Sequence, residues 1–148
     1  MKKWQKVFAA VAVVLLFGAS VVLAGPWKGS GGWGMNSQYQ RNFNPSTVET
    51  VSGTVAAVEQ TTPMKGMHHG IHIMLKKEKE TVEVHLGPSW YIERLDTKIE
   101  KGDKVEVKGS KVTMAGKKVI IAQEVKKGDN TLILRDSAGI PAWAGWRR

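Results

Sequence analysis

Histidine and methionine, the side chains that bind borderline and soft metal ions, are concentrated in one short stretch of this sequence. All four histidines fall between positions 68 and 85, and three of the six methionines fall between positions 64 and 74. Imidazole and thioether ligands together suit copper, and the thioether sulfur favours Cu(I). The stretch is therefore a candidate metal site, and its candidate ligands are Met64, Met67, His68, His69, His72 and His85.

Two of these histidines are spaced as partners in a β-hairpin. If Glu78 and Lys79 form a two-residue turn, His72 lies directly opposite His85. In this register six apolar residues share the other face of the hairpin: Ile71, Ile73, Leu75, Val82, Val84 and Leu86. A slip of one residue would expose all of them. The register therefore predicts a His72/His85 pair on the outward face, with Cβ atoms about 5 Å apart, a span that two imidazoles can close around one ion.

Each of these residues also has an ordinary structural interpretation. Methionine in an irregular loop commonly fills gaps against the core, and histidine on an outward face can be a solvated polar residue. Four neighbouring histidines would also repel one another once protonated at about pH 6, so a response to pH is an alternative role. Metal binding is the leading hypothesis for the cluster because ligand type and strand pairing point to it together.

The elements that would position this cluster are β-strands. Alternating and β-branched runs predict strands at 47–60, 71–77, 80–86, 105–114 and 117–125, with a sixth strand or edge extension at 131–135. Between the third and fourth strands, Gly87-Pro88-Ser89 begins a short amphipathic helix. This order predicts an all-β protein, a small five-stranded OB-like Greek-key barrel over 47–135. An SH3-like barrel or a β-sandwich would share the strands but accounts less readily for the helix.

The residues before this domain fall into two segments. A lysine-rich start and an apolar run that ends at Val22-Leu23-Ala24 predict a Sec-type signal peptide over 1–24 and a periplasmic protein. An uncleaved N-terminal anchor is the alternative, whereas cleavage would leave no stable transmembrane span. Residues 25–46 form an arm rich in Gly and aromatic residues without periodicity, and we expect its rings to dock onto the domain or a partner.

Composition and motifs limit the classes of function. The 148 residues allow one domain of ordinary size, and the absence of cysteine excludes disulfides, Cys-ligated zinc, Fe–S clusters and thiol catalysis. The formal net charge of +9 favours anionic partners, although export argues against nucleic acid as the physiological one. The chain lacks the Gly-x-Ser-x-Gly, phosphate-binding and His-Glu-x-x-His motifs, so we expect a binding protein and no enzyme.

Two resemblances to known families rest on particular segments. The Gly-Asp-x-Val-x-Val-x-Gly segment at 102–109, with Val51-Ser52-Gly53-Thr54-Val55, resembles the bacterial exported OB-fold (BOF-like) proteins. That resemblance covers about residues 47–125 and implies fold and export but no activity. More weakly, the chain is similar to the periplasmic copper- and silver-binding OB-fold proteins, which use Met and His on a barrel face near a Trp. That similarity implies ligands among Met64, Met67, His72 and His85, with Trp90 as the aromatic.

Three functional hypotheses follow, of which the third is an accessory subunit without a ligand. The first is a periplasmic metal-binding module, with copper as the leading metal, that uses His72 and His85 with Met67, His68 or His69. The second is an interaction module that holds an anionic glycan or lipid, or an envelope protein, through its basic face and exposed indoles. Those indoles are Trp90 and, in the C-terminal tail 136–148, Trp143 and Trp146, for which packing on the domain is the default.

Overall fold

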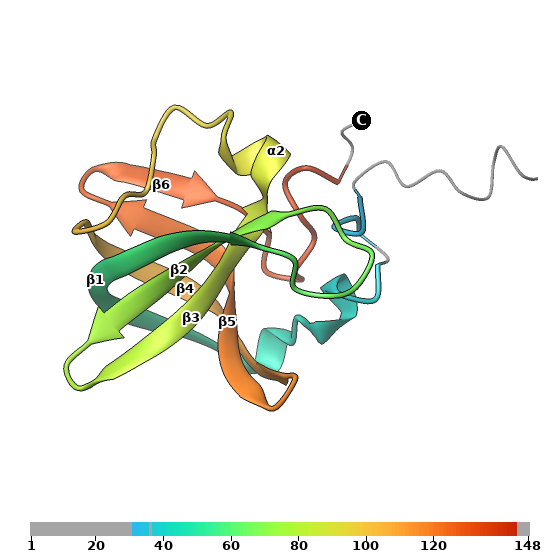
Figure 1. The fold of residues 1–148 in the computed structure, drawn as a ribbon, viewed down its shortest axis with the longest axis horizontal. Coiled ribbons are helices and arrows are strands. Elements are labelled where there is room, and N and C mark those ends of the chain that lie inside the picture. Colours follow the sequence, from blue (N-terminus) through green and yellow to red (C-terminus); the bar gives the residue numbers. More distant parts are fainter. Residues whose placement is uncertain (1–30, 36, 145–148) are drawn as a thin grey trace, which may run out of the picture.

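The computed structural model describes residues 31–35 and 37–144, so the predicted signal peptide and Trp146 lie outside the described residues. The described chain is mostly β, with one six-stranded sheet and little helix (Figure 1). The strands are β1 (Val48–Thr61), β2 (Gly70–Lys77), β3 (Glu80–Pro88), β4 (Lys104–Met114), β5 (Lys117–Lys127) and β6 (Asn130–Ile133). The sequence predicts either a sixth strand or an edge extension at 131–135, and the structure has a sixth strand that is part of the sheet.

Helical segments are short and lie where the chain leaves the sheet. The single turn α2 (Ser89–Ile92) stands between β3 and β4, as the sequence predicts. Two 3-10 turns, η1 (Gln40–Asn42) and η2 (Pro45–Thr47), lead into β1. Proline at the first position of η2 suits its fixed φ. Within the described residues, no helix has both the length and the apolar character that a membrane crossing requires.

The strand pairings close on themselves. The sheet order is β3-β2-β1-β4-β5-β6 with antiparallel neighbours, and a further parallel pairing joins β3 to β5. The pairings therefore form a circuit through β1, β2, β3, β5 and β4, with β6 outside it. Apolar strand residues with exposed fractions of 4% or less form the centre of the core: Val55, Ile73, Leu75, Val84, Leu86, Val105, Val107, Val119, Ile120, Ile121, Ala122 and Val125.

The β2–β3 hairpin has the predicted register over most of its length. His72 pairs with His85, and the pairing continues in step to the two-residue turn. The prediction that Ile71 lies opposite Leu86 is wrong, because an irregularity between Ile71 and His72 places Ile71 opposite Gly87. The turn chemistry and the apolar alternation thus determine the part of the hairpin that carries the histidines.

Gly53 does not mark the bulge that its place in a β-branched run suggests. The irregularity in β1 falls between Val55 and Ala57. At Gly53 a Cβ atom would lie 2.5 Å from the carbonyl oxygen of Lys76, so the residue is explained by the close approach of β2.

The N-terminal arm and the C-terminal segment lie side by side against the sheet, cyan and red in Figure 1. Trp33, Tyr39 and Phe43 of the arm are buried, which confirms for these three rings that the arm docks onto the domain. Trp143 is 0% exposed, and its indole Nε1 donates to the carbonyl oxygen of Trp33 at 2.8 Å. The default expectation that Trp143 packs on its own domain is therefore confirmed, and the alternative of an exposed Trp143 that contacts a ligand is wrong.

Candidate metal centre

His72, Glu83 and His85 form the closest group of metal-ligating side chains in the described part of the chain. His85 Nε2 lies 2.7 Å from Glu83 Oε2, and His72 Nδ1 lies 3.4 Å from the same oxygen. One ligand atom from each residue falls within 4.8 Å of the others. The hairpin explains the arrangement, because His72 and His85 are cross-strand partners and Glu83 precedes His85 by two residues on the same strand face.

The outward position predicted for the two histidines is wrong, because other segments cover this face of the hairpin. His72 is 3% exposed and His85 is 2% exposed. The Tyr39 ring of the arm stacks on His85 with ring centroids 5.9 Å apart, and Thr61 Oγ1 at the end of β1 lies 2.8 Å from His72 Nδ1. Alternation places the histidines correctly on the face opposite the apolar residues, but it cannot reveal what later segments cover.

Burial keeps both imidazoles neutral. Desolvation and then the adjacent His85 lower the pKa of His72 to about 4. Burial also lowers the pKa of His85, and this outweighs the opposing effect of Glu83. The two rings stack with centroids 3.8 Å apart and planes 7° apart, so a proton on one disfavours a proton on the other. Neutral imidazole is the form that binds a metal ion.

Glu83 supplies a carboxylate to this neutral pair. It is half-buried, and burial alone would raise its pKa, but hydrogen bonds from His85 and Lys117 lower the pKa overall. Lys117 Nζ lies 3.2 Å from Glu83 Oε1. The centre therefore offers two neutral imidazoles and one ionised carboxylate at neutral pH.

Glu83 fixes the tautomer of His85, and Tyr39 satisfies the other ring nitrogen. The Tyr39 hydroxyl lies 2.8 Å from His85 Nδ1. A carboxylate only accepts hydrogen bonds, so His85 Nε2 carries the proton that faces Glu83 and Nδ1 accepts from the hydroxyl. Burial raises the pKa of Tyr39, which keeps this hydroxyl protonated. The arm thus supplies the second hydrogen-bond partner of a candidate ligand.

Replacing Tyr39 by phenylalanine is expected to lower the free energy of unfolding by about 1–2 kcal/mol. The ring and its packing remain, but His85 Nδ1 is left buried without a donor. Urea unfolding of both proteins measures the change, and a Phe43→Leu variant in the same arm measures the cost of altered packing alone. An unchanged midpoint in Tyr39→Phe would show that the hydroxyl does not hold His85.

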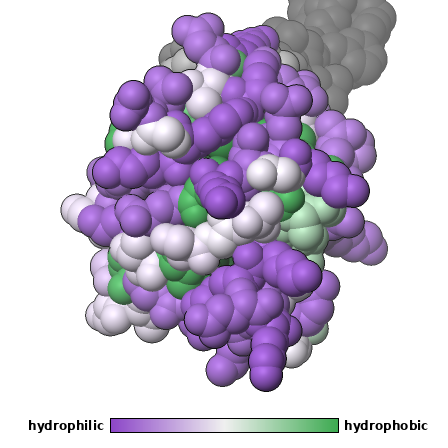
Figure 2. All heavy atoms as spheres, turned by 90° about the vertical axis from the view of Figure 1, so that its left-hand side faces the viewer, coloured by the Kyte–Doolittle hydropathy of each residue, from purple (hydrophilic) through white to green (hydrophobic). Residues whose placement is uncertain are grey.

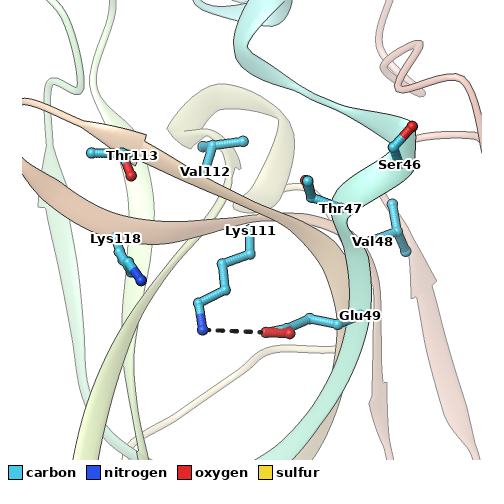
Figure 3. A pocket seen from close by; sticks show the side chains of 8 residues that line it. All are labelled: Ser46, Thr47, Val48, Glu49, Lys111, Val112, Thr113 and Lys118. Atoms are coloured by element: carbon cyan, nitrogen blue, oxygen red, sulfur yellow. Dashed lines mark ion pairs between the residues drawn. The ribbon is translucent and has the colours of Figure 1, made fainter.

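The three side chains open into a pocket of about 300 Å³. Thr61, Thr62 and Pro63 also line it, as do Met114 and Lys117. A separate pocket, shown in Figure 3, lies over β1, β4 and β5. Its charged groups are exposed, and the Lys111–Glu49 pair within it is 3.9 Å apart, so that pocket offers no comparable group of ligands.

Residues 47–132, more than half of the chain, match the model of the MamS/MamX magnetosome protein family. The chain belongs to this family. The resemblances to exported BOF-like proteins and to copper- and silver-binding OB-fold proteins are therefore corrected: general strand and glycine patterns carried the first, and the Met and His residue types carried the second. The MamS/MamX match includes His72, Glu83, His85 and Lys117, whereas Tyr39 precedes it. A comparison with curated proteins gives no significant match.

The other predicted ligands of this MamS/MamX chain lie outside the pocket lining. Met64 and Met67 are partly buried against the core. Gly31 closely approaches the ring of His68, and His69 Nδ1 lies 3.5 Å from Thr62 Oγ1 at the surface. The structure thus brings together two of the six, His72 and His85, and leaves Met64, Met67, His68 and His69 around them.

Other residues of the MamS/MamX chain have roles that sequence inspection missed. Glu83 is not among the predicted ligands, although its position two residues from His85 on one strand was the available signal. Met114 and Lys117 come from the β4–β5 hairpin, and no local pattern connects that hairpin to the histidines. Trp90, predicted as a nearby aromatic, is half-buried on α2 with its ring against Tyr91 and does not line the pocket.

Proposed function

We propose that this protein is a periplasmic, non-enzymatic metal-binding module that holds a divalent first-row metal ion through His72, Glu83 and His85. The observation that carries the proposal is the set of three ligand atoms within 4.8 Å of one another on one hairpin. Two imidazoles and one carboxylate form a known ligand set for Zn(II) and for non-haem Fe(II), and both kinds of site keep open positions.

The carboxylate changes the preferred metal. Cu(I) was favoured by thioether sulfur, and of the methionines only Met114 lines this pocket among the residues that the structure describes. Carboxylate and imidazole suit divalent ions, so Fe(II) and Zn(II) come first. Cu(II) stays in the comparison because it binds most such sites more tightly than its neighbours in the series.

Hydrogen bonds around the site support metal binding. A metal ion on His85 Nε2 requires the ring proton to move to Nδ1. The Nδ1–H group then donates a hydrogen bond to the Tyr39 oxygen. A hydroxyl donates or accepts equally well, so Tyr39 serves His85 in both states. Thr61 Oγ1 also lies 3.2 Å from His72 Nε2, so it can do the same for His72 when Nδ1 binds the metal. Such partners orient ligands and raise metal affinity.

We also propose that the fold is an OB-like barrel and that the protein is periplasmic. The circuit of pairings through β1, β2, β3, β5 and β4, with α2 between β3 and β4, supports an OB-like barrel. The composition of residues 1–24 supports export to the periplasm. In such a barrel the metal ligands belong to the face of the β2–β3 hairpin that points away from the barrel core, and the Tyr39 ring of the arm covers them.

Metal titration of the purified protein tests the function. Fe²⁺, Zn²⁺ and Cu²⁺ are titrated separately and anaerobically against a competing chelator. We expect one ion per protein, and we expect the variant His72→Gln plus His85→Gln to bind it more than about 100-fold more weakly, because two of three ligands are lost. The matched control is His68→Gln plus His69→Gln, which removes two exposed histidines from the same segment.

The control separates a built site from general histidine affinity. Wild-type affinity in the control and weak binding in the site variant, both folded by circular dichroism, would support the proposal. Equal binding by the two double variants would overturn it. So would the absence of stoichiometric binding for all three ions.

Charge supports a second candidate function, the binding of an anionic glycan, lipid or envelope protein. The chain carries nine excess positive charges, and the face shown in Figure 2 is hydrophilic with only small apolar areas. Trp143 is no longer available to such a partner because it is buried. Salt-sensitive binding that survives in the His72/His85 variant would favour this candidate.

A further inference from the structure

The pocket beside the three candidate ligands is larger than one metal ion needs. Its volume is about 300 Å³, whereas one water molecule occupies about 30 Å³ of liquid. The protein supplies three ligands, and divalent first-row ions take four or more. An ion held here therefore keeps open coordination positions beside a polar space.

Metal binding changes the balance of charge in this pocket. Before an ion binds, the Glu83 carboxylate and the Lys117 ammonium balance each other at 3.2 Å, and Glu59, which also lines the pocket, leaves one negative charge over. A divalent ion adds two positive charges, and His72 and His85 remain neutral as ligands. The loaded pocket then carries a formal net charge of about +1, with an ammonium close to the ion. An anion is the partner that this charge favours.

The pocket contains donors that suit an oxyanion. The Lys117 side chain is 69% exposed, so its ammonium is free to turn from Glu83 towards a bound ligand. It stands just after the β4–β5 turn, at the rim of the pocket. Thr61, whose hydroxyl also contacts His72, and Thr62 line the same pocket. Ammonium and hydroxyl groups around a metal ion form charge-assisted hydrogen bonds to phosphate or carboxylate oxygens.

We propose that the metal-loaded protein binds a small oxyanion, of the phosphate or carboxylate class, that completes the coordination of the ion and pairs with Lys117. This inference rests on the proposed metal site and names its full cargo. The protein then carries a metal–oxyanion complex, and a free ion is only one component of it. Lys117 determines the affinity for the anion and is not a ligand of the metal.

Cobalt(II) gives a direct measurement, because its visible spectrum changes with its coordination. Protein saturated with Co²⁺ is titrated with inorganic phosphate, with chloride at matched ionic strength as the control salt. We expect a saturable spectral change with phosphate alone. Lys117→Met should weaken phosphate binding about tenfold at saturating Co²⁺, because one charge-assisted contact is lost. The matched control is Lys118→Met, which removes the neighbouring ammonium in the pocket of Figure 3.

The outcomes distinguish the two proposals. If Co²⁺ gives no spectrum that depends on His72 and His85, the metal site itself fails and the oxyanion site fails with it. If that spectrum appears but phosphate leaves it unchanged, the oxyanion inference is wrong and the metal site stands. Equal effects of Lys117→Met and Lys118→Met would also overturn the inference, since they would indicate general attraction to a basic surface. Selective loss in Lys117→Met supports it.

Discussion

Replacement of Trp143 by alanine is expected to lower the free energy of unfolding by about 3–5 kcal/mol, as the loss of a buried aromatic side chain does. The indole is 0% exposed and contacts the rings of Trp33 and Tyr91, with centroids 6.4 and 5.1 Å away. The substitution also removes the hydrogen bond to the Trp33 carbonyl and the ring beneath the buried Arg135 guanidinium. Those losses add to the cavity.

Guanidinium unfolding followed by far-ultraviolet circular dichroism measures this change without depending on tryptophan fluorescence. Ile140→Ala is the control in the same segment, because that side chain is 40% exposed and its loss should cost less than about 1 kcal/mol. Equal effects of the two substitutions would mean that the C-terminal segment does not dock in solution. A large effect of Trp143→Ala alone would confirm that the arm and this segment form one packed unit.

The metal-free protein is expected to lose stability as pH falls from about 6.5 to about 4. His72 has a pKa of about 4 in the folded protein, lowered first by burial and then by the adjacent His85, and about 6.5 when unfolded. Between these values the unfolded chain binds a proton that the folded chain does not, so stability rises with pH in this window. The lowered pKa of His85 acts in the same direction.

The size of this effect follows from the linkage of about 1.4 kcal/mol per pKa unit. Because the two histidines are coupled, we expect roughly 2–3 kcal/mol to be lost between pH 6.5 and pH 4. Urea unfolding at several pH values, with a chelator present, measures the slope. The His72→Gln variant should show a shallower slope in this window. A wild-type stability that stays constant from pH 6.5 to pH 4 would contradict the buried, neutral histidine pair.

The sequence predicts how the strands of the hairpin pair, but it does not predict which segments cover the hairpin. The pairing of His72 with His85 follows from a two-residue turn and from alternation, both local properties of the chain. The bulge at Ile71 departs from this register because neither property reports where a strand bends. The burial of the histidines depends on the arm and on β5, which are distant in sequence.

The composition of the site shows the same limit. Methionines near the histidines in sequence suggested copper, but two of them pack against the core. Met114 reaches the pocket from another hairpin, as does Lys117. Similarly, the arm and the C-terminal segment both contain aromatic residues, but no local pattern indicates that Trp33 of the arm packs on Trp143. Residue types were therefore a better guide to strands than to neighbours across the fold.

The parallel contact between β3 and β5 and the docking of the arm have a kinetic consequence. All three candidate ligands belong to one hairpin, which can form in about 1–10 μs. The cover over them requires segments that are far apart in the chain, and such long-range contacts form slowly. The ligands are thus assembled before they are enclosed. We therefore expect an ion present while the chain folds to meet an open site, and an ion that arrives later to enter through the pocket that Lys117 lines.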